Sequence, residues 1–99
     1  MRLRLDPAKG SQDAFSFALA HSQQYAASCG HPFSPKELWK VLREAGLSLE
    51  EGGRTLADGP ESDAEGFFTA ALALDHLYAQ GILKRRLDPS GVYVYSGGT

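Results

Sequence analysis

Three stretches of the chain carry apolar residues at helical spacing, and each begins near a serine and ends at a glycine. They cover residues 11–30, 34–46 and 62–81. Apolar side chains three, four and seven residues apart fall on one face of a helix. A glycine just past a helix end readily adopts the left-handed backbone conformation that often terminates a helix. We expect Gly30, Gly46 and Gly81 to adopt it. The sequence therefore predicts three helices with defined ends.

The second and third helices begin with capping boxes. Ser34 precedes Pro35 and Glu37, and Ser62 is followed by Glu65. In such a box the serine oxygen accepts a hydrogen bond from the backbone N–H three residues on, and the glutamate bonds back to the serine N–H. Proline suits the first turn because its missing N–H has no helical partner there. We therefore expect these helices to start at the two serines.

The third helix is apolar around more of its circumference than one buried stripe requires. Its predicted stripe consists of Phe67, Ala71, Leu74 and Tyr78, widened by Phe68, Leu72 and Leu77. The excess can pack on a long first helix. It can instead form a surface for a homodimer or for a different protein.

After residue 81 the pattern changes from helical to extended. Residues 82–87 and 92–95 flank Asp88-Pro89-Ser90-Gly91, in which the proline and the glycine suit a type I turn with a glycine bulge. The sequence therefore predicts a β-hairpin. Its expected register pairs Leu87 with Tyr93 and Arg85 with Tyr95, and places Lys84 and Arg86 on the opposite face with Val92 and Val94. A shift by one residue would exchange the two faces.

The remaining segments are less regular. Residues 47–60 hold three glycines and a proline, and we expect a long loop there, with a helical turn near residues 48–51. Arginine and leucine alternate over residues 2–5, which suits a short strand. A chain of 99 residues accommodates one domain. We divide it into an N-terminal arm or short strand (1–10), a mostly α-helical domain with a C-terminal hairpin (11–96) and a short tail (97–99).

The end of the third helix carries a family resemblance. Residues 73–83 read Ala-Leu-Asp-His-Leu-Tyr-Ala-Gln-Gly-Ile-Leu. This stretch resembles the Ala-Leu-x-x-Leu-x-x-x-Gly-apolar-apolar pattern with which winged helix-turn-helix domains end their third helix and enter the wing. Residues 31–38 resemble the short first strand and capped second helix of that superfamily. The resemblance covers about residues 11–96 and implies a three-helix core with a hairpin wing, while leaving the function open.

The resemblance also implies where a nucleic acid would bind. The third helix would be the recognition helix, and residues 87–92 would form the tip of the wing. The outward strip of the helix would consist of Ser62, Glu65, Thr69, Ala73, His76 and Gln80. The wing would contribute Lys84, Arg86 and Ser90.

The charge distribution departs from that of DNA-reading relatives. Residues 61–80 include acids but no lysine or arginine, and the position just before the Ala-Leu pair, which is often basic in such relatives, is Leu72. Cations supply most phosphate contacts and the commonest base contacts. We therefore expect backbone contacts from the wing, the N-terminal arm and the start of the second helix. The expected DNA-binding residues are Lys84, Arg86, Ser90, Lys36, Thr69, His76, Gln80, Arg2 and Arg4.

No catalytic or metal-binding pattern stands out. His21, His31 and Cys29 match no familiar zinc spacing, and a structural zinc site takes four ligands. We expect Cys29 to be a small core residue and the acidic clusters to be solvated or to complement the helix dipole. We expect core positions for Trp39 and for phenylalanines 15, 17, 33, 67 and 68. The expectation is therefore no metal, no cofactor and no enzymatic activity.

Two functions remain open. The first is a small DNA-binding protein, a transcriptional regulator or accessory factor, monomeric or dimeric, that grips double-stranded DNA through its wing. The second is a protein-interaction module, an adaptor or complex subunit, whose acidic and apolar third helix docks a partner. Superfamily frequency ranks the DNA-binding function first, although the charge distribution favours the alternative.

Composition sets the broader limits on this chain. The net charge of −2 excludes a strongly basic nucleic-acid protein, although it leaves room for a local basic patch. The sequence has no apolar run long enough to span a membrane and no signal-peptide pattern at its start. We expect a cytoplasmic location.

Overall fold

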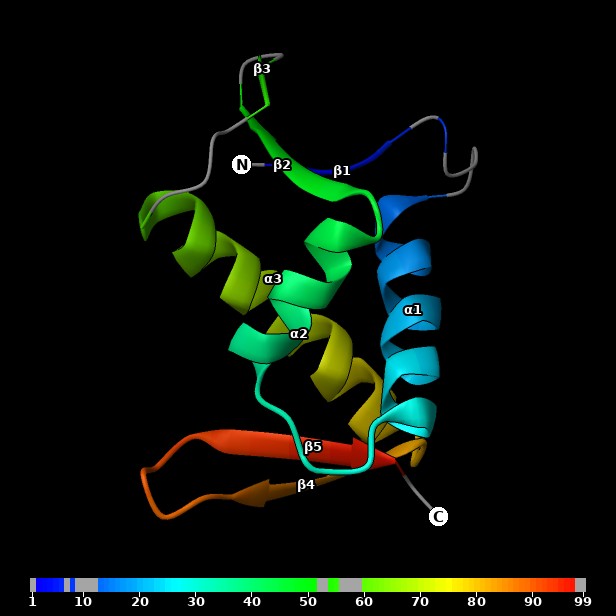
Figure 1. The fold of residues 1–99 in the computed structure, drawn as a ribbon, viewed down its shortest axis with the longest axis vertical. Coiled ribbons are helices and arrows are strands. Elements are labelled where there is room, and N and C mark those ends of the chain that lie inside the picture. The colour runs from blue at the N-terminus through cyan, green and yellow to red at the C-terminus, as the bar shows by residue number, and fades with distance from the viewer. Residues whose placement is uncertain (1, 7, 9–12, 52–53, 56–59, 98–99) are drawn as a thin grey trace.

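The computed structural model describes residues 2–6, 8, 13–51, 54–55 and 60–97. Three helices lie between two small antiparallel sheets, which occupy opposite ends of the 38 Å long axis (Figure 1). The helices are α1 (Ala14–Ser28), α2 (Pro35–Glu44) and α3 (Pro60–Ala79), and the strands are β1 (Arg2–Leu5), β2 (Leu47–Glu51), β3 (Arg54–Thr55), β4 (Leu83–Leu87) and β5 (Tyr93–Gly97). The chain is therefore a small α/β domain, with more strand than the sequence predicted.

The first helix is confirmed, with different ends. Asp13 caps it, because its carboxylate accepts the backbone N–H of Ser16 at 3.1 Å; Ser11, the predicted start, lies outside the described residues. At its other end, Cys29 already has extended backbone (φ −80°, ψ 126°). The chain thus leaves α1 before Gly30, and the prediction of a left-handed Gly30 is wrong.

The second helix starts where predicted, and the third does not. The Ser34 hydroxyl accepts the Glu37 N–H at 3.3 Å and caps α2. In contrast, α3 begins at Pro60, and Ser62 is 5% exposed inside its first turn. The predicted cap at Ser62 is therefore wrong, because proline starts the helix two residues earlier. Gly46 (φ 115°) and Gly81 (φ 79°) end α2 and α3 in the left-handed conformation, as predicted.

The buried face of α3 is rotated relative to the prediction. Its fully buried side chains are Ala70, Ala73, Leu74 and Leu77. Ser62 and Ala73, expected on the outward strip, face the interior, whereas Phe68, Leu72 and Tyr78, expected in the buried stripe, are exposed. The assignment of Phe68 to the core is wrong; Phe33 and Trp39 are core residues as expected, while Phe15, Phe17 and Phe67 are half-buried.

Packing against α2 explains this rotation. A Cβ atom at Gly66 would lie 2.0 Å from the ring of Trp39, which is 2% exposed. The large indole thus requires a glycine at position 66, and α3 is rotated so that Gly66 and its neighbouring small residues face α2. Close fit to the partner helix outweighs burial of the largest apolar side chains.

The segment after α2 is a strand rather than the predicted loop with a helical turn. Leu47 and Leu49 are buried, and the residues between and after them are more exposed. This alternation gives one apolar face, which β1 completes by pairing Leu3 with Leu49 and Leu5 with Leu47. The predicted strand at the N-terminus is confirmed, and it supplies the pairing partner that makes the following segment extended.

The C-terminal hairpin is confirmed in its predicted register. Leu87 pairs with Tyr93 and Arg85 with Tyr95. Gly91 has a φ of 87° in the turn, and the Asp88 carboxylate accepts the backbone N–H groups of Ser90 and Val92. On its other edge, β5 forms a bridge between Tyr95 and Phe33, which joins the α1–α2 connection to the hairpin. Among the described residues, no helix has the length and hydropathy to cross a membrane.

We predict that Gly66→Ala destabilises the fold. The added methyl group would collide with the Trp39 ring, and overpacking of this kind costs about 1–3 kcal/mol. Urea unfolding followed by circular dichroism measures the loss. Gly30→Ala is the matched control, since nothing lies within 4 Å of a Cβ there. Equal free energies of unfolding for the two variants would contradict the packing argument.

Candidate functional site

The hairpin and the exposed side of α3 hold most of the residues expected to bind DNA. Lys84 and Arg86 are exposed, on the strand face opposite Leu83 and Arg85. Neither forms an ion pair in the part of the chain that the structure describes. Lys36 is exposed at the start of α2, three residues after Phe33, whose backbone bonds to β5. These three cations therefore lie on or near the hairpin.

The N-terminal arginines lie elsewhere. β1 is at the opposite end of the long axis from the hairpin (Figure 1). Arg4 there has its Nε 3.7 Å from the Glu50 carboxylate, and the side chain of Arg2 lies outside the described residues. The structure therefore does not bring these arginines together with the cations of the hairpin.

The polar residues expected to contact DNA have partners of their own. Thr69 donates its hydroxyl to the Glu65 carbonyl at 2.9 Å. The His76 ring lies edge-on to Phe15 at 6.4 Å and 3.2 Å from the Gln80 amide nitrogen. The Ser90 hydroxyl lies 2.6 Å from the Asp88 carboxylate, and this hydrogen bond holds the pKa of Asp88 below its ordinary value.

The exposed face of α3 is apolar and acidic. Phe68 is 62% exposed and Leu72 48%, and they stand four residues apart, so their side chains are neighbours. Glu65 is exposed one turn before them. Along the described residues of α3, this face presents no lysine or arginine. It lacks the cations that groove recognition by a helix ordinarily uses.

Asp75 links α3 to the hairpin. One of its carboxylate oxygens accepts the Tyr95 hydroxyl and lies 3.3 Å from the Arg85 guanidinium. That guanidinium also lies over the rings of Tyr78, at 4.2 Å, and Tyr93, at 4.5 Å. Arg85 is thus held by one anion and two aromatic faces. The hairpin register predicts the pairing of Arg85 with Tyr95, whereas Asp75 comes close only because α3 docks on the hairpin.

Burial and the Asp75 contact change the acidity of Tyr95. Its side chain is 2% exposed, and burial, with the neighbouring carboxylate, raises its pKa to about 12. Neutral phenol is the form that donates to Asp75. The folded state therefore holds this proton more tightly than the unfolded chain does.

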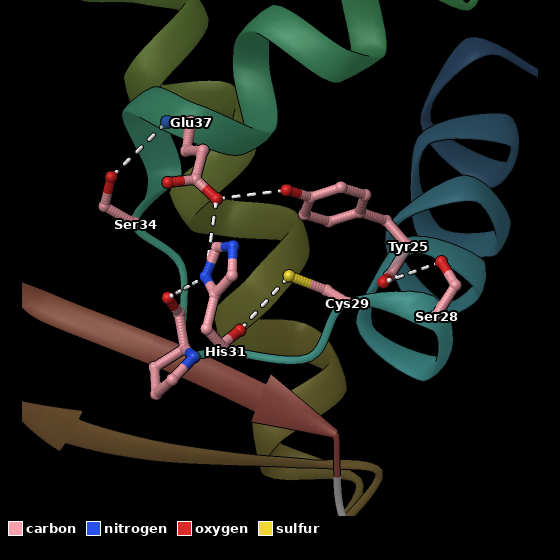
Figure 2. Close-up of polar contacts among 7 residues, drawn as sticks. Tyr25, Ser28, Cys29, His31, Ser34 and Glu37 are labelled. Atoms are coloured by element: carbon pink, nitrogen blue, oxygen red, sulfur yellow. Dashed lines mark hydrogen bonds and ion pairs between the residues drawn. The ribbon is translucent and has the colours of Figure 1, made fainter.

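A second cluster joins the end of α1 to the start of α2 (Figure 2). The Glu37 carboxylate accepts the Tyr25 hydroxyl at 3.0 Å and lies 4.0 Å from the His31 Nδ1. The Cys29 thiol donates to the His31 carbonyl at 3.2 Å. One ligand atom from each of Cys29, His31 and Glu37 lies within 4.8 Å of the others. Burial and hydrogen bonds with Cys29 and Glu37 raise the pKa of the Tyr25 hydroxyl, which keeps it protonated.

Glu37, and not the His21 considered from the sequence, lies beside Cys29 and His31. His21 instead stacks on Phe17, with ring centroids 5.6 Å apart. Glu37 was assigned to the capping box, which needs its carboxylate at the Ser34 N–H. The available signal was a Cys-x-His pair at the end of one helix, followed by an acid in the first turn of the next.

A pocket of about 590 Å³ borders this cluster. Cys29 and His31 line one side of it, and Lys84 and Ser96 of the hairpin line another. The pocket gives water and small solutes access to the thiol and the imidazole. Comparisons with protein-family models, with curated proteins and with solved structures found no match to this chain.

We predict that Tyr95 makes stability fall at alkaline pH. Its pKa is raised from 10.0 to about 12 on folding, so its contribution is complete below pH 10 and declines as the pH rises toward 12. By about pH 11 the loss should be about 1 kcal/mol. Urea unfolding at pH 9 and 11 measures it. Tyr95→Phe should reduce this decline, and Tyr93→Phe, the matched loss of an exposed phenol, should not. Identical declines in both variants would refute the assignment.

Proposed function

We propose that this chain is a non-catalytic winged-helix interaction module whose third helix binds protein. The order of elements supports the winged-helix interpretation: α1, the Phe33 bridge, α2 and α3 precede the β4–β5 hairpin, and Phe33 pairs with Tyr95 at the edge of β5 that faces away from β4. The structure departs from the winged-helix pattern at strands β2 and β3. They lie between α2 and α3 in place of a short turn, and β2 pairs with β1.

The observation that carries the protein-binding proposal is the exposed pair Phe68 and Leu72 on the face of α3 that a recognition helix turns outward. Folding leaves these two large apolar side chains in water although α3 has buried positions filled by alanine. Such a patch gains free energy by burial, at about 25 cal/mol per Å² of apolar surface. A DNA groove offers phosphates and base edges to this face, which has an acid and no cation to meet them.

A second copy of the chain is the partner that this surface fits. The exposed apolar pair lies about one turn from the exposed Glu65, whereas Lys84 and Arg86 are on the face of β4 that points away from α3, because Arg85 on the other face contacts Asp75. A two-fold axis at the apolar pair would set two α3 helices antiparallel and bury Phe68 and Leu72 of one copy against the same residues of the other. An isologous contact requires this self-complementarity.

We predict that the protein is a dimer in solution and that Phe68→Ser/Leu72→Ser is monomeric. Sedimentation equilibrium up to about 100 μM would detect self-association with a micromolar dissociation constant. The double variant should keep the unfolding free energy of the monomer, since both side chains are exposed. Leu87→Ser, an exposed apolar residue at the hairpin end, is the control and should remain dimeric. A wild-type protein that is monomeric throughout this range would overturn the choice of partner.

DNA binding is the second candidate, favoured by one observation: Lys84 and Arg86 are exposed on one strand face without ion pairs among the described residues. Such cations suit phosphate contacts that carry no sequence information.

If the wing grips DNA, anisotropy of labelled duplex should show binding that weakens steeply between about 50 and 200 mM salt. Lys84→Ala/Arg86→Ala should lose that binding, whereas Lys40→Ala, a matched exposed lysine on α2, should keep most of it. Absence of binding at the lower salt by the folded protein would eliminate this candidate and leave the protein-binding proposal standing.

A further inference from the structure

We propose that Cys29, His31 and Glu37 form a binding site for a divalent transition-metal ion, with Zn²⁺ as the ion that the ligand set fits best. The three residues come from three consecutive pieces of the chain: the C-cap of α1, the connection after it and the first turn of α2 (Figure 2). Their ligand atoms lie within 4.8 Å of one another. This site goes beyond the proposed function and does not depend on it.

The chemistry of the donors selects the class of ion. A thiolate, an imidazole and a carboxylate together suit Zn²⁺, whereas Ca²⁺ and Mg²⁺ require oxygen ligands. Zinc sites with three protein ligands leave a fourth position for water or another small ligand. The pocket lined by Cys29 and His31 provides room for that ligand.

The distances require only a small contraction. Bond lengths of about 2.0–2.3 Å place the ligand atoms of a tetrahedral zinc site about 3.3–3.8 Å apart. One ring nitrogen of His31, the Cys29 sulfur and a Glu37 carboxylate oxygen already lie within 4.8 Å of one another. The side chains of His31 and Glu37 are about half exposed or more, so they can move without disturbing the core. The Cys29 thiol would exchange its bond to the His31 carbonyl for the metal.

Neighbouring groups already orient two of the ligands. The Tyr25 hydroxyl donates to the Glu37 carboxylate at 3.0 Å, and the Tyr25 ring packs edge-on against buried Phe33 with centroids 4.9 Å apart. The Nδ1 of His31 lies 2.9 Å from the Pro32 carbonyl oxygen. A proton on that nitrogen would leave the lone pair of Nε2 for a metal. Hydrogen bonds of this kind fix ligand orientation in metal sites.

The conformation of Glu37 is an independent indication. A capping box would direct its carboxylate back to the Ser34 N–H. Among the described residues that bond is not formed; the carboxylate faces Tyr25 and His31 instead (Figure 2). Glu37 thus lacks the capping bond to the Ser34 N–H, and its carboxylate lies beside the Cys29 thiol and the His31 imidazole instead.

Titration of the reduced 99-residue chain with Zn²⁺ and with Co²⁺ tests the site. One equivalent should bind, and the Co²⁺ complex should show thiolate-to-metal charge transfer and the strong visible bands of a tetrahedral ion. Cys29→Ser, His31→Gln and Glu37→Gln should each weaken binding by more than about 100-fold, because even lost partners of ligands cost 10–100-fold. Circular dichroism establishes that each variant is folded.

Two further variants separate a built site from adventitious binding. His21→Gln removes a histidine outside the cluster and should bind Zn²⁺ as the wild type does. Tyr25→Phe keeps all three ligands but removes the hydroxyl from Glu37, and should weaken binding about 10–100-fold. Failure of the wild-type protein to bind Zn²⁺ at about 100 μM, or unchanged binding by folded Cys29→Ser, would overturn the proposal. Equal losses in His21→Gln and His31→Gln would do so as well.

Discussion

The contact between Trp39 and Gly66 is the constraint on which the arrangement of the helices depends. The indole is almost completely buried, and the backbone of α3 passes so close to it that even a methyl group has no room. This fixes the distance between α2 and α3 and the rotation of α3 about its axis. The indole N–H is buried without a hydrogen-bond partner among the described residues, which costs about 1–3 kcal/mol. Close packing of the ring offsets that cost.

The rotation of α3 has consequences on both of its sides. It turns Ala70 and Ala73 into the core and leaves Phe68 and Leu72 in water. It also directs Asp75 at the hairpin, where the carboxylate meets Tyr95 and Arg85. The exposed apolar face of α3 and the polar attachment of the hairpin thus both result from the packing of α3 on Trp39. A helix with its largest apolar residues inward would have neither.

The Phe33–Tyr95 bridge connects the other parts of the molecule. Through Phe33, the α1–α2 connection is an edge of the hairpin sheet. Through Tyr95, the same sheet is bound to α3. The cluster of Tyr25, Cys29, His31 and Glu37 lies along this connection and at the two helix ends that it joins. An ion held there would join the two helix ends that flank Phe33, so it would act on the segment that positions the hairpin.

Local chemistry in the sequence determined much of the fold. Ser34 and Pro35 set the start of α2, Gly46 and Gly81 set two helix ends, and the Asp88–Gly91 turn set the hairpin register, because each depends on bonds or torsions within a few residues. The exposed Lys84 and Arg86 followed from that register. The sequence did not decide whether the partner is DNA or protein. A superfamily pattern describes only a fold, and the acidic charge of the third helix argues against DNA.

Tertiary structure decided what depends on distant neighbours. Residues 47–51 are a strand because β1 pairs with them, and α3 is rotated as it is because Trp39 needs a residue without a side chain opposite it. Glu37 stands beside Cys29 and His31 because α1 and α2 meet at that point. Periodicity shows that a helix has an apolar side, but it cannot give the rotation when nearly every position is apolar or small. Fit to a particular partner supplies that information.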